Sequence, residues 1–89
     1  MRIVIDFAFV QDKQTLYVGL KDIFKDYEFY GNNLDALMEV LMCLKNVEIV
    51  IKNIKKLEES LDEYASKVIN TFKLASVEND LLNVIIEEV

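Results

Sequence analysis

Two carboxylates, Asp35 and Glu39, stand one helical turn apart in residues 33–44, a stretch with helical apolar spacing. At about 100° per residue, its leucines share one arc and the two acids fall on the opposite side, together with Met38 and Met42. Such a pair could perform acid–base chemistry, hold Mg²⁺ or bind cations of a partner. An ordinary solvated face is the alternative, although like charges at this spacing destabilise a helix and no lysine compensates within it.

The composition argues against an enzyme. Histidine is absent, which removes the usual general base, the commonest metal ligand and the Ser–His and Cys–His pairs. Cys43 is the single cysteine, so neither a structural zinc site nor an internal disulfide can form. Gly19 and Gly31 are the only glycines, too few for a phosphate-binding loop. We therefore expect no catalytic residue, no metal and no cofactor, and nothing in the sequence predicts a pocket around Asp35 and Glu39.

The formal net charge is −6, from ten basic and sixteen acidic residues. Direct nucleic-acid binding favours the opposite sign, whereas a basic protein is a good electrostatic match; many soluble proteins, however, are acidic only for solubility. No stretch approaches the roughly 18 uncharged apolar residues of a membrane span. The apolar start of the chain is interrupted by Asp6 and lacks a cleavage site of small residues, so we expect a cytoplasmic protein.

The element order expected from periodicity is β-α-α-β-α-α-β within one domain, residues 1–89. Helical connections between buried strands imply a small parallel sheet with right-handed crossovers, and hence an α/β fold in which about four helices pack on three strands. Ser60 and Glu63 form a capping-box pattern for the last helix. The expected strands are Arg2–Phe7, Val47–Lys52 and Leu82–Glu87, and the expected helices are Lys13–Lys25 (capped by Asp12), Asn33–Leu44 (capped by Asn32 or Asn33), Ile54–Glu59 and the helix that begins at Ser60.

The loop before the acidic helix, residues 26–32, carries Phe29 and Tyr30 followed by Gly31. Aromatic residues on loops often form recognition surfaces, but a ring can also close the core. We expect both, with one ring directed inward and the other outward.

Residues 30–37 read Tyr-Gly-Asn-Asn-Leu-Asp-Ala-Leu and closely resemble the signature of the barstar family. That signature is an aromatic pair, Gly, any residue, Asn-Leu-Asp-Ala-Leu and an acid two positions on. The element order and total length also agree, although other residue matches are looser. The resemblance implies a barstar-like, three-layer fold and an intracellular bacterial inhibitor of a secreted basic ribonuclease, in a toxin–antitoxin-like immunity pair.

The resemblance also implies roles for individual residues. Asp35 and Glu39 would enter the nuclease site in place of substrate phosphate and pair with its cations. Phe29 would be the outward aromatic, Gly31 and Asn33 would shape the loop and the helix cap, and Leu34 would lie at the rim. The predicted partner-binding set is Phe29, Tyr30, Gly31, Asn33, Leu34, Asp35, Met38 and Glu39.

Four departures from the family pattern leave the partner's identity open. Glu39 is one methylene longer than the aspartate expected there, and Met38 replaces a tryptophan. Phe29 replaces a tyrosine, and Leu74 stands where a further acid is expected. A basic ribonuclease is the first expectation, and a partner that is not a ribonuclease is the alternative. We expect the free protein to be a monomer.

Overall fold

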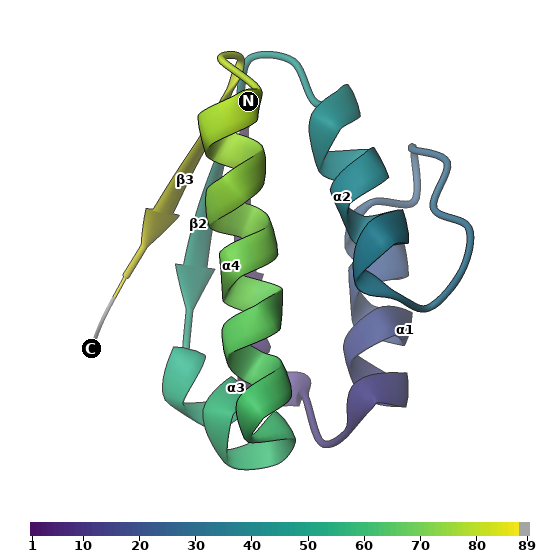
Figure 1. Cartoon of the computed structure of the whole chain (residues 1–89), viewed down its shortest axis with the longest axis vertical. Helices are drawn as coiled ribbons and strands as arrows, with labels where there is room; N and C mark the ends of the chain where they lie inside the picture. The colour runs from purple at the N-terminus through teal and green to yellow at the C-terminus, as the bar shows by residue number, and fades with distance from the viewer. Residues whose placement is uncertain (88–89) are drawn as a thin grey trace.

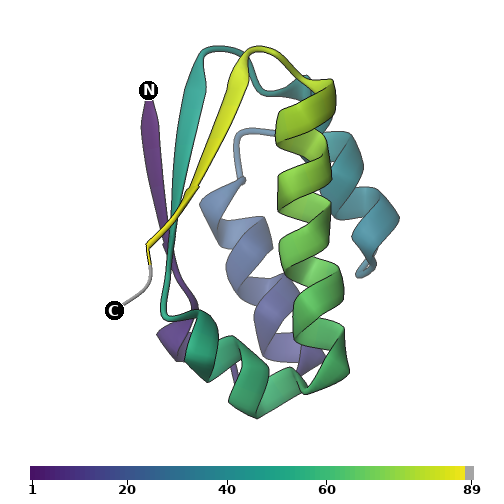
Figure 2. The same ribbon diagram turned by 60° about the vertical axis from the view of Figure 1, so that its left-hand side comes forward.

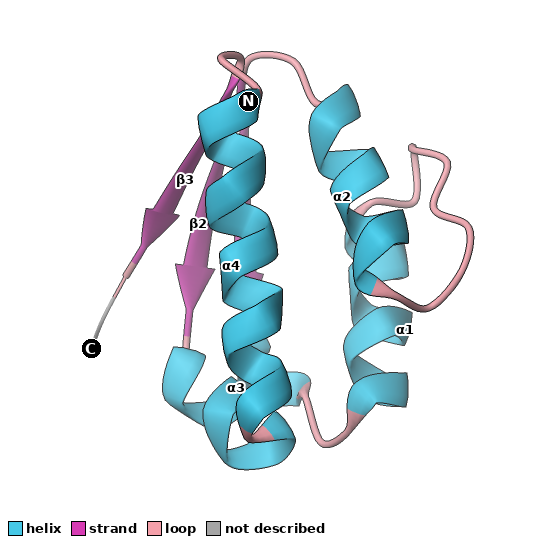
Figure 3. Ribbon diagram, viewed as in Figure 1, coloured by secondary structure: helices cyan, strands magenta, loops and turns pink. Residues whose placement is uncertain are grey.

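A computed structural model describes residues 1–87, and Figure 1 follows the chain through three strands and four α-helices. Figure 3 separates helices from strands by colour. The predicted domain included residues 88 and 89, which lie outside the described residues. The elements are β1 (Arg2–Asp6), the 3₁₀ turn η1 (Phe7–Phe9), α1 (Lys13–Ile23), α2 (Leu34–Cys43), β2 (Val47–Lys52), α3 (Ile54–Leu61), α4 (Glu63–Glu78) and β3 (Leu82–Ile86).

The three strands form the parallel sheet that the sequence predicted, in the order β1-β2-β3. Ile5 lies beside Ile51, and Ile51 lies beside Ile86, so apolar side chains line up across one face of the sheet. Ile5 and Ile51 are fully buried there. The α/β architecture with four helices and a three-stranded parallel sheet is confirmed.

The number of layers differs from the expectation of three. Figures 1 and 2 show the helices on one side of the sheet only. On the other side, Val4 and Ile85 keep 49% and 40% of their surface exposed. The strand order advances in one direction, so two right-handed crossovers place their helices on the same face. The described chain therefore folds into two layers, and no helix of residues 1–87 lies on the second face of the sheet.

The junction between α3 and α4 corrects the predicted capping box. Ser60 lies inside α3, and its Oγ donates a hydrogen bond to the carbonyl oxygen of Val10 at 2.8 Å. The break falls at Asp62, whose φ of 50° ends α3 and whose side chain makes no cap bond to α4. Ser60 thus binds a distant carbonyl instead of capping the following helix.

Asn79, the residue after α4, fastens the end of α2. Its Nδ2 donates to the carbonyl oxygens of Leu41 and Leu44 at 3.1 and 2.9 Å. Its Oδ1 accepts from the backbone N–H of Leu81 at 3.1 Å. One side chain therefore ties the carboxyl end of α2 to the turn between α4 and β3.

Candidate functional site

Helix α2 presents the two acids because its other side is committed to the core. The side-chain oxygen of Asn33 accepts from the backbone N–H of Ala36 at 2.8 Å and caps the helix. Leu37 and Leu41 are fully buried. Buried residues on the core side fix the rotation of the helix, and Asp35 and Glu39 are both exposed, as the spacing predicted. We call these two residues the acidic ridge.

Within the described residues, no basic side chain pairs with the acidic ridge. Within residues 1–87, neither Asp35 nor Glu39 forms a salt bridge or accepts a side-chain hydrogen bond, whereas Lys52 and Glu87 do pair, at 3.7 Å. The last turn of α2 also has no basic residue. Two carboxylates one turn apart repel each other, so the ridge is a concentrated negative charge that a cationic group can approach.

The aromatic loop places one ring inward and one outward, as predicted, but the assignment of Phe29 is corrected. Phe29 is 9% exposed and belongs to the core, whereas Tyr30 is 78% exposed. Phe29 packs edge-to-face with Tyr17 of α1, with ring centroids 6.4 Å apart, and Lys21 Nζ lies 5.9 Å from its centroid. These neighbours hold the Phe29 ring inward, so Tyr30 is the aromatic side chain that a partner can contact.

Two tyrosines, Tyr17 and Tyr64, lie behind this loop, and Tyr17 packs directly on Phe29. The hydroxyl groups of Tyr17 and Tyr64 are hydrogen-bonded at 2.6 Å and link α1 to α4. Burial and this hydrogen bond raise the pKa of Tyr17 well above the ordinary value of a phenol. Lys13 Nζ lies 4.2 Å from the centre of the Tyr64 ring. Sequence reasoning gave Tyr17 and Tyr64 no such role, because no local pattern reveals a hydrogen bond between residues 47 positions apart.

Gly31 forms the turn between the exposed aromatic and the cap of α2. Its φ is 93°, a conformation that L side chains rarely adopt. A Cβ at this position would also lie 3.2 Å from Asn33 Nδ2. Gly31 and Asn33 therefore fix the path from Tyr30 to the acidic ridge, which agrees with the shaping role that the resemblance implies.

Apolar side chains flank the ridge. Leu34 and Met38 are half-buried and pack partly against the core, whereas Met42 is 40% exposed. On the neighbouring helix α4, Leu74 is 51% exposed. Cys43, the last residue of α2, is exposed. Met42 was outside the predicted partner-binding set, although its spacing already put it on the face of the acids.

Among residues 1–87, no group of three or more His, Cys, Asp or Glu side chains could hold a metal ion. Two surface hollows, of about 410 and 230 Å³, are lined by other residues than Asp35 and Glu39. No helix in the described part of the chain is long and apolar enough to cross a membrane.

Comparison with known proteins gives one match and one negative result. A family model described as barstar (barnase inhibitor) matches residues 1–86, nearly the whole chain. No curated protein matches the chain.

Proposed function

The chain belongs to the barstar family, and from this we propose that it inhibits a basic, secreted ribonuclease by placing Asp35 and Glu39 in the enzyme's active site. Members of this family bind and inhibit ribonucleases and are not enzymes themselves. We infer the same for this chain, with cytoplasmic action and a protein partner in place of RNA.

One observation carries the proposal: the acidic ridge is exposed and, within residues 1–87, is not neutralised by any basic side chain. An active site that cleaves RNA must hold the phosphate with cationic groups. Two carboxylates entering that site would accept charge-assisted hydrogen bonds from those groups, while offering no phosphodiester bond to cleave.

The residues beside the ridge have supporting roles in this mechanism. Tyr30, which is 78% exposed, takes the aromatic contact that the resemblance gave to Phe29. An exposed tyrosine supplies both a ring and a hydroxyl to an interface. Met38 and Met42 have unbranched side chains that adapt to the surface of a partner. Gly31 and Asn33 contribute indirectly, because they fix the backbone conformation between Tyr30 and the acidic ridge.

A charge-reversal variant tests the proposal. Asp35→Lys combined with Glu39→Lys should abolish inhibition of RNA hydrolysis by barnase or another basic ribonuclease. It should change the free energy of unfolding by no more than about 1 kcal/mol, because both side chains are exposed and the main cost is a charge near the helix terminus. For the wild type, association should slow as salt rises, since ions screen charges over about 10 Å at 0.1 M.

A matched control separates this site from net charge. Glu58→Lys combined with Glu59→Lys makes the same change of charge on α3, where both side chains are exposed. This control should inhibit like the wild type. Equal inhibition by the ridge variant and the wild type would overturn the proposed site.

A barstar-like module with a partner other than a ribonuclease is the second candidate function. The exposed Leu74 favours it, because an apolar side chain stands where the family resemblance implies an acid. The wild type would then fail to inhibit barnase and other basic ribonucleases, yet the acidic ridge would still capture a partner from the native cell extract.

A further inference from the structure

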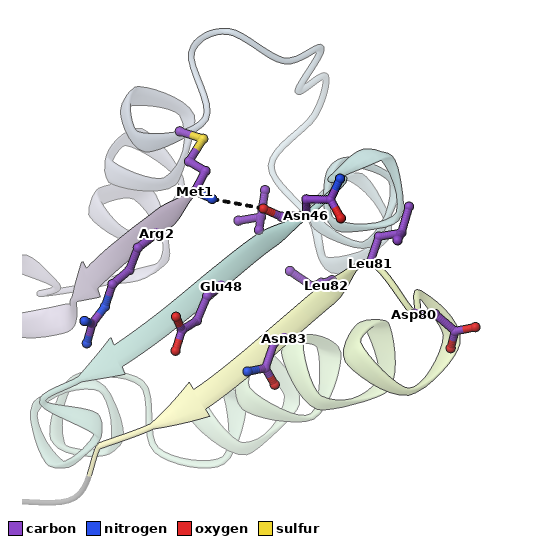
Figure 4. A pocket seen from close by; sticks show the side chains of 9 residues that line it. Met1, Arg2, Asn46, Glu48, Asp80, Leu81, Leu82 and Asn83 are labelled. Atoms are coloured by element: carbon purple, nitrogen blue, oxygen red, sulfur yellow. Dashed lines mark hydrogen bonds between the residues drawn. The ribbon is translucent and has the colours of Figure 1, made fainter.

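The face of the sheet without helices, here called the outer face, has its side chains in three rows across the strands. Strand register places Arg2 beside Glu48 and Glu48 beside Asn83, and this forms the amino-end row. Figure 4 shows these three side chains projecting from neighbouring strands. The row thus carries a positive charge on β1 and a negative charge on β2.

The middle row is apolar. Val4, Val50 and Ile85 lie side by side in register. Val50, on the central strand, is 1% exposed, whereas Val4 and Ile85 on the outer strands keep 49% and 40% of their surface in water. The helices are all on the other side of the sheet, so no element of the described chain covers this row (Figure 2).

The carboxyl-end row reverses the charge order of the first. Asp6 lies beside Lys52 in register, so here β1 carries the negative charge and β2 the positive one. Lys52 also pairs with Glu87 at 3.7 Å. Asp6 accepts hydrogen bonds from Asn53 Nδ2 and from Ala8 N–H, which hold its carboxylate in place and lower its pKa.

We propose that this outer face is an interface between two copies of the chain, packed face to face with antiparallel strands. A two-fold axis across the strands at Val50 would bring the amino-end row of one copy over the carboxyl-end row of the other. Arg2 then faces Asp6 of the second copy, and Glu48 faces Lys52 of the second copy. Each pair of opposite charges occurs twice, and the middle rows meet each other.

The symmetry of the charges selects this arrangement. With the axis along the strands instead, Glu48 would face Glu48 and Lys52 would face Lys52, so both central contacts would be repulsive. Sheets that pack face to face lie about 10 Å apart at about −30°, so the central pairs stay closest to their counterparts. Glu48 and Lys52 are therefore the residues that decide the pairing.

A surface hollow provides room for the opposing lysine. A hollow of about 410 Å³ opens beside the amino-end row, with Arg2, Glu48 and Asp80 among the residues that line it (Figure 4). Lys52 of the second copy has a long, flexible side chain that can reach Glu48 in this hollow.

The face is small, which sets the strength of the association. A stable interface buries roughly 800 Å² on each partner, and three strands of about five residues offer less. The free protein, which the sequence led us to expect as a monomer, should on this proposal form a weak dimer between about 10 µM and 1 mM. The acidic ridge lies in the helical layer, away from the outer face, so dimerisation leaves it accessible (Figure 2).

Two complementary variants of the full chain test the proposal by sedimentation equilibrium. Glu48→Lys places lysines opposite lysines, and Lys52→Glu places acids opposite acids, so each variant alone should be monomeric at 1 mM. An equal mixture of the two should form a heterodimer, because every central contact then joins opposite charges. Its association should weaken at high salt.

Lys73→Glu makes the charge change of Lys52→Glu on the exposed side of α4, away from the outer face, and should leave wild-type association unchanged. A wild type that is monomeric at 1 mM overturns the proposal, and so does a mixture that stays monomeric. Inhibition of ribonuclease by each charge variant keeps this test separate from the proposed function, which does not use the outer face.

Discussion

Replacing Asn79 by alanine should loosen the attachment of the acidic helix and destabilise the fold by about 2 kcal/mol. The substitution removes two donated hydrogen bonds, at 3.1 and 2.9 Å, to the carbonyls of Leu41 and Leu44. Leu41 O keeps a backbone bond from Leu44 N–H, but Leu44 O loses its side-chain donor in a half-buried place. Each net hydrogen bond contributes about 1 kcal/mol, and an unpaired buried carbonyl costs about 1–3 kcal/mol.

The loss is measurable by urea and thermal unfolding. For a domain of this size, 2 kcal/mol corresponds to a decrease in Tm of about 8–16 °C, and the urea midpoint should fall without a change in the m value. Asn79→Asp keeps the acceptor for Leu81 N–H, but it puts a carboxylate oxygen in place of the amide donor that faces the carbonyl oxygens of Leu41 and Leu44. Because these oxygens repel each other, the variant should be at least as destabilising as Asn79→Ala at neutral pH. Asn83→Ala, at an exposed position in β3, should remain within about 0.5 kcal/mol of the wild type. If Asn79→Ala unfolds at the wild-type Tm, the two hydrogen bonds from Asn79 to the end of α2 do not stabilise the fold.

Two further predictions concern the aromatic residues near the site. Phe29→Ala should cost about 3–5 kcal/mol in urea unfolding because the ring is buried, whereas Tyr30→Ala should leave stability nearly unchanged and weaken ribonuclease inhibition; equal stability losses would contradict the assignment of the inward ring. The raised pKa of Tyr17 means that an unfolded chain loses this proton near pH 10 while the folded chain keeps it. Its stabilising contribution is therefore complete below about pH 10 and is lost as pH rises further, so Tyr17→Phe should show a shallower loss of unfolding free energy between pH 10 and 12.

Local patterns were enough to predict the elements. Apolar periodicity placed α1, α2 and β2 to within about two residues, and Asp12 and Asn33 cap their helices as expected. These features depend on neighbours in the sequence, so the sequence alone determines them. The same spacing correctly placed Asp35 and Glu39 on the exposed side of α2.

Features that depend on distant residues could not be predicted. Val4, Val50 and Ile85 make the strands continuous apolar runs, which are typical of sheets covered on both faces, yet the outer face carries no helix. The loop around Phe29 has no period, so only its packing on Tyr17 decides which ring turns inward. Ser60 matched a capping pattern, but the carbonyl of Val10 competes for its hydroxyl.

Because the side chains of the acidic ridge make no bond to the rest of the described chain, folding places almost no demand on their identity. Gly31, Asn33 and the buried leucines of α2 keep the backbone in place whatever residues the ridge carries. Substitutions at Asp35, Glu39 or Met42 can therefore accumulate without loss of the folded state. The surface that meets a partner can therefore change by exchange of a few side chains while the fold that carries it stays the same.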